Sequence, residues 1–318
     1  MRLAAAALAI CALTVGACSG EREALTRSTE PTAVVLNSPP VPTLLPVSTS
    51  VPAPDLLADR PFDVVVPTAY DGSTPMPLVV LLHGLGITGA MQENFFRFQD
   101  LADSRGFLMV SPDGTRNADG SPFWNATDAC CGSDASVDDS SYLAAVIERV
   151  QADYVVDAQR VFLIGYSNGG FMSYRMACDH AEVIAAIVSI NAASFLDRAQ
   201  CTPADPVSVV EIHGTDDETI AYGGGTFAGT QHPSARQTVA QWADYNECQG
   251  APTVTEATLD LDRALAGKET NVLRYDPCAP GGAAELWTIM GGEHVPELSS
   301  SFSEEVIDFL LAHPKPLA

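Results

Sequence analysis

The clearest chemical signal in the sequence is a serine placed between two glycines, in the run Gly165-Tyr166-Ser167-Asn168-Gly169. The apolar stretch 161–164 precedes it and the amphipathic stretch 169–179 follows it, so it stands between an expected strand and an expected helix. In that setting the two glycines permit a sharp strand-to-helix turn, which exposes the serine hydroxyl at the carboxyl end of the strand. We therefore predict that Ser167 is a nucleophile.

A serine hydroxyl needs a general base, and the base needs an acid that orients it. After a turn of this kind the acid and then the histidine follow in the chain, each on a loop after a later strand. His294 follows the apolar run 286–290 and is the predicted base. The other downstream histidine, His313, falls at the end of an expected helix near the C-terminus, where a capping or solvated role is more common.

Three acidic residues follow the expected strand 207–212, and one of them must orient His294. The run His213-Gly214-Thr215-Asp216-Asp217 matches a pattern, His-Gly-Thr-x-Asp, which in α/β hydrolases carries its acid in the fifth position. Asp217 is therefore the predicted acid, and Asp216 is the alternative. His213 itself is interpreted as a structural residue at a strand end.

Two backbone N–H groups are expected to stabilise the negative charge that develops on the substrate oxygen. One belongs to Asn168, directly after the nucleophile. The other is assigned to Leu85, because His83-Gly84-Leu85-Gly86 follows the early strand 78–82 and its glycines allow close backbone approach. His83 is interpreted as architectural, since it precedes the serine.

These residues require a scaffold of parallel strands with helices between them. Short apolar runs rich in β-branched residues alternate with amphipathic stretches, which is typical of a sheet buried on both faces. Strands are expected at 62–66, 78–82, 107–111, 161–164, 186–190, 207–212 and 286–290, and helices at 94–104, 137–154, 169–179, 234–246 and 304–312. The predicted fold class is α/β: an α/β-hydrolase fold with a mostly parallel central sheet and helices on both faces.

The N-terminal region is predicted to direct export. Residues 1–17 carry a single charge and an apolar run too short to span a bilayer, as in a signal peptide. Val15-Gly16-Ala17-Cys18 resembles a bacterial lipobox, so Cys18 is the candidate for lipidation, with an ordinary secretory leader as the alternative. Residues 18–60 are rich in Pro, Ser and Thr and are interpreted as a disordered tether, which places the catalytic domain at 61–318.

Charge and cysteine content restrict the partners. The net charge of -24 disfavours nucleic acid and anionic lipid surfaces, so membrane attachment is expected only through a lipid on Cys18. Of the eight cysteines, Cys11 and Cys18 fall in the leader or at its end, which leaves six for disulfides in an exported chain. Their pairing stays open, but Cys130 and Cys131 are expected to bond two different partners, because a bridge between neighbours is strained.

Several short motifs together resemble the secreted esterase family that includes feruloyl esterases, acetylxylan esterases and polyhydroxybutyrate depolymerases, a group similar to carbohydrate esterase family 1. The motifs are His83-Gly84, Pro112-Asp113-Gly114, Trp124-Asn125, Cys130-Cys131, Val137-Asp138-Asp139, Gly165 to Gly170, and His213-Gly214-Thr215-x-Asp217. The resemblance covers about 62–311. It implies an exported serine esterase without metal or cofactor, whose substrates are feruloyl or acetyl esters of plant polysaccharide, or polyesters of the poly-3-hydroxybutyrate type.

One departure from the family pattern leaves substrate contacts open. A tryptophan commonly stands two residues after the family's histidine, whereas Val295-Pro296 follows His294 directly. Trp124 is the candidate to line the site instead, with a role in the core as the alternative. Asp138 and Asp139 are interpreted as a helix cap rather than a metal site.

Two other functions share these residues. A surface acyltransferase would use the same triad to pass the acyl group to a sugar, and a non-catalytic carbohydrate-binding lipoprotein would use only the scaffold. The intact set Ser167, Asp217 and His294 favours ester hydrolysis. The oligomeric state is not predicted.

Overall fold

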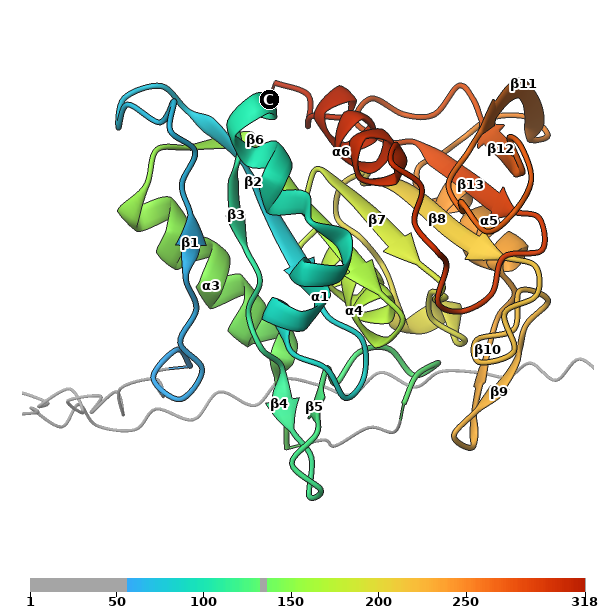
Figure 1. The fold of residues 1–318 in the computed structure, drawn as a ribbon, viewed down its shortest axis with the longest axis horizontal. Coiled ribbons are helices and arrows are strands. Elements are labelled where there is room, and N and C mark those ends of the chain that lie inside the picture. Colours follow the sequence, from blue (N-terminus) through green and yellow to red (C-terminus); the bar gives the residue numbers. More distant parts are fainter. Residues whose placement is uncertain (1–55, 132–135, 318) are drawn as a thin grey trace, which may run out of the picture. The chain divides into compact units, whose positions relative to one another are not determined.

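A nine-stranded sheet forms the centre of the molecule (Figure 1). The computed structural model describes residues 56–131 and 136–317, which lie within one compact unit, 53–318. The predicted signal peptide, Cys18 and the predicted tether up to residue 55 therefore lie outside the described residues. Within the described part of the chain, no helix is long and apolar enough to cross a membrane.

The sheet is mostly parallel. Its strands, in spatial order, are β1 (Val64–Val65), β3 (Leu108–Val110), β2 (Met76–Leu82), β6 (Val156–Tyr166), β7 (Ala186–Ile190), β8 (Ser208–Gly214), β13 (Ala284–Ile289), β12 (Thr270–Tyr275) and β11 (Thr253–Leu259). The six strands from β3 to β13 pair in parallel, and antiparallel β1, β12 and β11 lie at the edges. This confirms the predicted parallel sheet.

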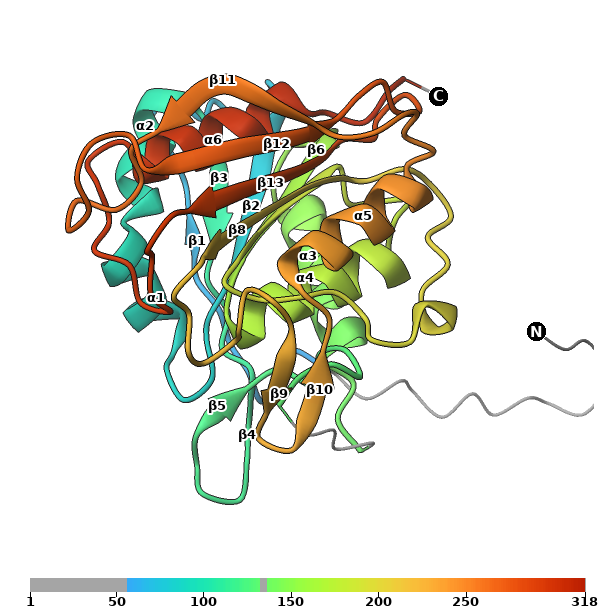
Figure 2. The same ribbon diagram turned by 90° about the vertical axis from the view of Figure 1, so that its right-hand side faces the viewer.

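Helices cover both faces of this sheet (Figure 2). One face carries α3 (Asp139–Asp153), α4 (Asn168–Asp179) and α5 (Ala235–Tyr245), and the other carries α1 (Gly89–Phe96), α2 (Ala102–Arg105) and α6 (Phe302–Ala312). Along β2, Leu78 and Val80 pack into the first layer, whereas Val79 and Leu81 pack into the second. Because successive side chains of a strand point to opposite faces, β2 contributes to two separate hydrophobic cores.

The structure differs from the expected elements at one helix and six strands. The helix expected at 94–104 is broken into α1, the 3-10 turn Phe98–Leu101 and α2. Arg97 at the break has φ of 59°, and the resulting turn lets Phe96 and Phe98 both enter the core. The hairpin of β4 (Thr115–Arg116) and β5 (Pro122–Phe123), and that of β9 (Gly225–Phe227) and β10 (Thr230–His232), were not expected; neither were β11 and β12.

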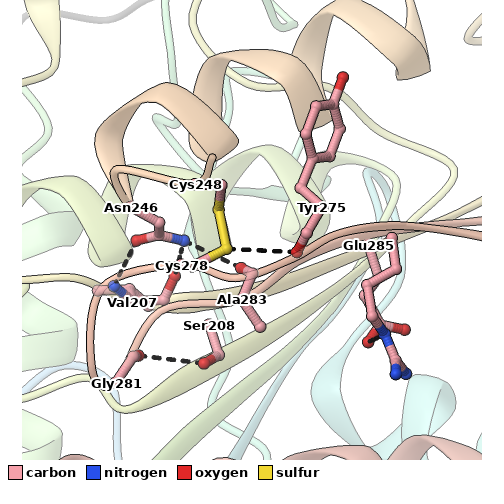
Figure 3. The surroundings of a disulfide bond; sticks show 10 residues. Val207, Ser208, Asn246, Cys248, Tyr275, Cys278, Gly281, Ala283 and Glu285 are labelled. Atoms are coloured by element: carbon pink, nitrogen blue, oxygen red, sulfur yellow. Dashed lines mark hydrogen bonds and ion pairs between the residues drawn. A yellow bond between two sulfur atoms is a disulfide. The ribbon is translucent and has the colours of Figure 1, made fainter. Parts of the chain in front are cut away.

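Disulfides join Cys178 to Cys201 and Cys248 to Cys278, so α4 and the end of α5 are each tied to a neighbouring loop. Figure 3 shows Asn246 beside the second bridge, accepting the Val207 N–H and donating to the carbonyl oxygens of Val207 and Ala283. The bridge and these bonds attach the end of α5 to the central sheet.

The expectation that Cys130 and Cys131 reach different partners is wrong, because they bond each other. The other four described cysteines pair among themselves and leave no alternative partner. Cys131 has φ of 66°, a left-handed conformation in which the chain turns at this dipeptide.

The cap interpretation is confirmed for Asp138, whereas Asp139 is the first residue of α3. Asp138 accepts the Ser141 N–H at the start of α3, and Asp139 forms a 2.5 Å ion pair with Arg60. The Arg60 guanidinium also lies 3.5 Å from the centre of the Tyr142 ring. Arg60, placed at the end of the predicted tether, therefore belongs to the folded domain, because a buried carboxylate holds it.

Candidate active site

Ser167 lies on the turn between β6 and α4, with φ of 52° and ψ of −120°. A Cβ on Gly165 would come within 2.0 Å of the Gly169 carbonyl oxygen, and one on Gly169 would come within 2.2 Å of the Leu82 oxygen. Only glycine fits at these two positions. The expected turn is therefore present, with the serine in the strained conformation typical of such turns.

The structure brings Ser167, His294 and Asp217 into one hydrogen-bonded chain. His294 Nε2 lies 3.0 Å from Ser167 Oγ, and His294 Nδ1 lies 2.7 Å from Asp217 Oδ2. Asp217 Oδ1 accepts the backbone N–H groups of Thr219 and Ile220, which fixes the carboxylate. Asp216 is exposed and bonds only its neighbour Thr215 among the described side chains.

The three residues meet because their strands end at one edge of the sheet. Ser167 follows β6, Asp217 follows β8, and His294 follows β13, all of which run parallel. The carboxyl ends of parallel strands lie at the same edge, where α/β proteins place their sites.

Two residues that the sequence analysis missed hold the loop of His294. Its carbonyl oxygen accepts bonds from the Tyr166 hydroxyl and from Asn191 Nδ2, each at 2.7 Å. Asn191 Oδ1 also accepts the Gly214 N–H, so Asn191 links the loops that carry the acid and the base. The signal for Asn191 was its position directly after the apolar strand 186–190, at the same edge as Ser167.

Asp217 is ionised despite its burial. Desolvation acts to raise its pKa, but the hydrogen bonds with His213 and His294 outweigh burial and hold the pKa of Asp217 well below its usual value. Burial raises the pKa of the neighbouring Tyr166 phenol, which therefore stays protonated and donates to the His294 carbonyl.

The loop after β2 lies against the nucleophile turn. A Cβ on Gly84 would come within 3.0 Å of the Tyr166 ring and 3.6 Å of Ser167 Cβ. Gln92 accepts the Gly84 N–H and fixes the loop. Among the described residues, the N–H groups of Leu85 and Asn168 have no hydrogen-bond acceptor, so both are free to bind an oxygen beside Ser167.

Trp124 does not line the site, so that prediction is wrong. Its side chain is completely buried, and its indole N–H donates to the His83 carbonyl oxygen. The backbone of Trp124 instead holds Asn168: the Asn168 side chain accepts the Trp124 N–H and donates to its carbonyl oxygen. The alternative interpretation therefore holds: Trp124 is a core residue, and its ring packs beside His83.

An open pocket of about 470 Å³ lies in front of Ser167. Its walls are mainly apolar and come from the loop after β2, from α1, from β9 and from the residue after His294. The lining side chains include Leu85, Ile87, Met91, Phe95, Phe227 and Val295. Met91 and Val295 are more than half exposed, and Leu85 and Phe95 are more than a third exposed, so an apolar rim surrounds the pocket.

Comparisons with known proteins identify relatives of this chain among esterases. The profile of the family described as Phospholipase/Carboxylesterase matches residues 68–247, more than half of the chain. Feruloyl esterase B of Piromyces equi is 28% identical over 244 residues, which are 73% of this chain and 42% of that protein. Feruloyl esterase D of Neurospora crassa is 26% identical over 250 residues, 74% of each chain.

The chain thus spans less than half the length of the first of these relatives. The fold is similar to that of an acetyl xylan esterase from Aspergillus awamori, with a TM-score of 0.57 and 16% identity over 78% of this chain and 93% of that one. These findings confirm the predicted α/β-hydrolase fold and the resemblance to carboxylic ester hydrolases. The chain belongs to the Phospholipase/Carboxylesterase family.

Proposed function

We propose that this protein hydrolyses carboxylic esters through an acyl-enzyme, with Ser167 as nucleophile, His294 as general base and Asp217 as the acid that orients His294. The single observation that carries the proposal is the chain of short contacts from Ser167 Oγ through His294 to Asp217. Ser167 and His294 line an apolar pocket, which suits the binding of an acyl group.

In the first half of the reaction, His294 Nε2 takes the proton of Ser167 as Oγ attacks the ester carbonyl carbon. The carbonyl oxygen becomes an oxyanion, which the N–H groups of Leu85 and Asn168 stabilise. When the tetrahedral intermediate collapses, the bond to the alcohol oxygen breaks, and His294 gives its proton to the departing alcohol. In the second half, His294 takes a proton from water as the water oxygen attacks the acyl-enzyme carbonyl carbon. The bond to Ser167 Oγ then breaks, the acid is released, and His294 returns the proton to Ser167.

The pocket supports esters with a bulky apolar acyl group. An acetyl group would leave most of 470 Å³ unfilled, whereas a feruloyl group has an aromatic ring that apolar walls can bury. The relatives named feruloyl esterase support the same class. We therefore take feruloyl esters of plant polysaccharide as the substrate, with acetyl esters and poly-3-hydroxybutyrate as the alternatives.

Such a substrate is polymeric and lies outside the cell, which agrees with the proposed export and with a lipid anchor on Cys18. The proposed tether, which begins at Cys18 and ends before Arg60, contains several prolines and would hold the folded domain away from a membrane surface. Export and anchoring are part of this proposal.

The test compares rates on a feruloyl sugar ester, an acetylated sugar and a short 3-hydroxybutyrate oligomer, each with wild-type protein and with Ser167→Ala. The highest kcat/KM is expected on the feruloyl ester, and Ser167→Ala should abolish turnover of all three. A preference for the acetylated sugar or the oligomer would reassign the substrate. Diversion of product from free acid to a new ester on addition of a sugar would support the acyltransferase.

A further inference from the structure

His213 lies at the end of β8, directly behind Asp217, and its ring is almost completely buried. Its Nδ1 lies 2.9 Å from Glu211 Oε1, and its Nε2 lies 2.7 Å from the Ile220 carbonyl oxygen. The same Nε2 is 3.5 Å from Asp217 Oδ2, the oxygen that accepts the bond from His294.

Both ring nitrogens of His213 therefore face oxygen atoms that accept hydrogen bonds. A neutral imidazole carries one N–H and could satisfy only one side, whereas an imidazolium donates from both nitrogens. Glu211 has the contacts of a carboxylate, because Oε1 accepts the Ala192 N–H at 3.0 Å and Oε2 accepts the Tyr174 hydroxyl at 2.9 Å. The contacts thus favour a cation between two carboxylates.

His83 provides the contrast within the same molecule. It is equally buried, yet its Nδ1 faces the Gly84 carbonyl oxygen while its Nε2 accepts the Gly114 N–H. One donor and one acceptor satisfy a neutral ring, and burial lowers the pKa of His83. At His213 burial also acts to lower the pKa, but the hydrogen bonds to Asp217 and Glu211 outweigh it and raise the pKa to about 9.

We infer that His213 is a buried imidazolium and a positioning residue, which holds Asp217 from behind and offsets its negative charge. The inference deepens the proposed function and rests on it for its catalytic consequence. Glu211 and Asp217 are both carboxylates, and without the cation between them both charges would act on His294. They would then favour its protonated form, in which it cannot accept the proton of Ser167.

Two uncharged side chains also lie beside His213. The Tyr222 ring packs edge-on at 5.7 Å between ring centres, and Thr288 faces His213 across the pairing of β8 with β13. Tyr174 reaches the cluster only through Glu211, and burial keeps its pKa well above the usual value. The charge balance of the cluster therefore depends on Glu211, His213 and Asp217.

The first test observes the proton itself, in the intact protein and without an activity assay. In protein labelled with ¹⁵N-histidine, the His213 ring, assigned through its contact with Tyr222, should show both nitrogens protonated from about pH 5.5 to pH 8. The same signal is expected in Ser167→Ala. A neutral tautomer at pH 7 would overturn the inference, and it would do so whether or not the protein hydrolyses esters.

The second test asks whether the cation affects His294. In His213→Gln the acid limb of the kcat/KM profile should move up by about one pH unit, which is roughly a tenfold loss near pH 6. His83→Gln is the matched control, because it removes a buried neutral histidine: it should lower the rate at every pH without moving the limb. The double variant Glu211→Gln/His213→Gln should recover part of the shift, since one of the two opposing carboxylates is gone.

The outcomes are separable. Equal losses at all pH values in His213→Gln, or the same limb shift in His83→Gln, would reduce His213 to a packing residue. If wild-type protein hydrolysed no ester, the proposed function would fail, while the NMR result would still decide the charge of His213.

Discussion

At the scale of single residues, the site depends on a few side chains that each satisfy several contacts. Asp217 uses one oxygen for two backbone N–H groups and the other for His294 and His213. Asn191 and Tyr166 fix the His294 carbonyl, so the base is held by its backbone as well as by its ring. The geometry is therefore preorganised before any substrate binds.

The variants Asp217→Asn and Asp216→Asn should show which of the two acids orients His294. Only the acid that holds His294 in its productive tautomer contributes to catalysis, so Asp217→Asn should lower kcat by about 10³ to 10⁴. Asp216 is exposed, and Asp216→Asn should stay within about twofold of wild type. Steady-state rates of both purified variants check this, and a larger defect in Asp216→Asn would transfer the role to that residue.

At the scale of elements, α1 supplies one wall of the pocket and also carries a buried carboxyl group, whose burial destabilises its charged form. Met91, Gln92 and Phe95 face the pocket, while Glu93, one position away, points into the interior. Glu93 Oε1 accepts the Gln99 N–H, but its buried Oε2 has no partner among the described residues. One helix thus carries the apolar wall of the site and an unsatisfied carboxyl group.

Phe95→Ala should weaken binding of aromatic acyl groups. Removing the ring takes away apolar surface that a feruloyl group would bury, so kcat/KM on a feruloyl ester should fall about tenfold. The rate on an acetylated sugar should change by less than about twofold, because a small acyl group does not reach the rim. Val254→Ala is the control, since Val254 is an exposed residue of β11 outside the pocket lining. Equal losses on both esters would contradict the pocket assignment.

Glu93→Gln should stabilise the protein in a pH-dependent way. Burial raises the pKa of Glu93 from 4.5 to about 7, so the folded state holds a proton that the unfolded state releases between those values. Stability from this group is therefore lost as pH rises from about 4.5 to 7, and the full cost applies above pH 7. The gain in Tm of Glu93→Gln over wild type should be larger at pH 8 than at pH 5. A gain independent of pH would contradict the buried charge.

Much of this arrangement could be predicted from the sequence, because long apolar strands and a Gly-x-Ser-x-Gly turn leave local signals. β7 and α4 were predicted within about a residue, and the three residues proposed as the triad were selected by their order after strands. The break at Arg97, the Cys130–Cys131 bridge and the short hairpins were not predictable in this way. They depend on tertiary packing and on single left-handed residues, for which the sequence has no periodic pattern.

At the scale of the whole molecule, the proposed lipid anchor on Cys18 gives a prediction about membrane attachment. Cys18→Ser should release the protein from membranes of a bacterial host, whereas wild type should partition with them. Two acyl chains bind firmly, since each buried methylene contributes about 0.8 kcal/mol, and a high-salt wash should therefore release little wild-type protein. Soluble wild-type protein with an unmodified terminus near Cys18 would reject the anchor and leave the esterase proposal intact.

The most direct test of the central claim is the mass of the intact protein during turnover of a slow aromatic ester at acidic pH. The account predicts an acyl adduct on the wild-type chain, mapped by peptide analysis to Ser167, and its decay as free acid appears. Ser167→Ala should show no adduct and should lose at least about three orders of magnitude in rate while keeping its fold. Turnover by Ser167→Ala near the wild-type rate, or an adduct on another residue, would contradict the account.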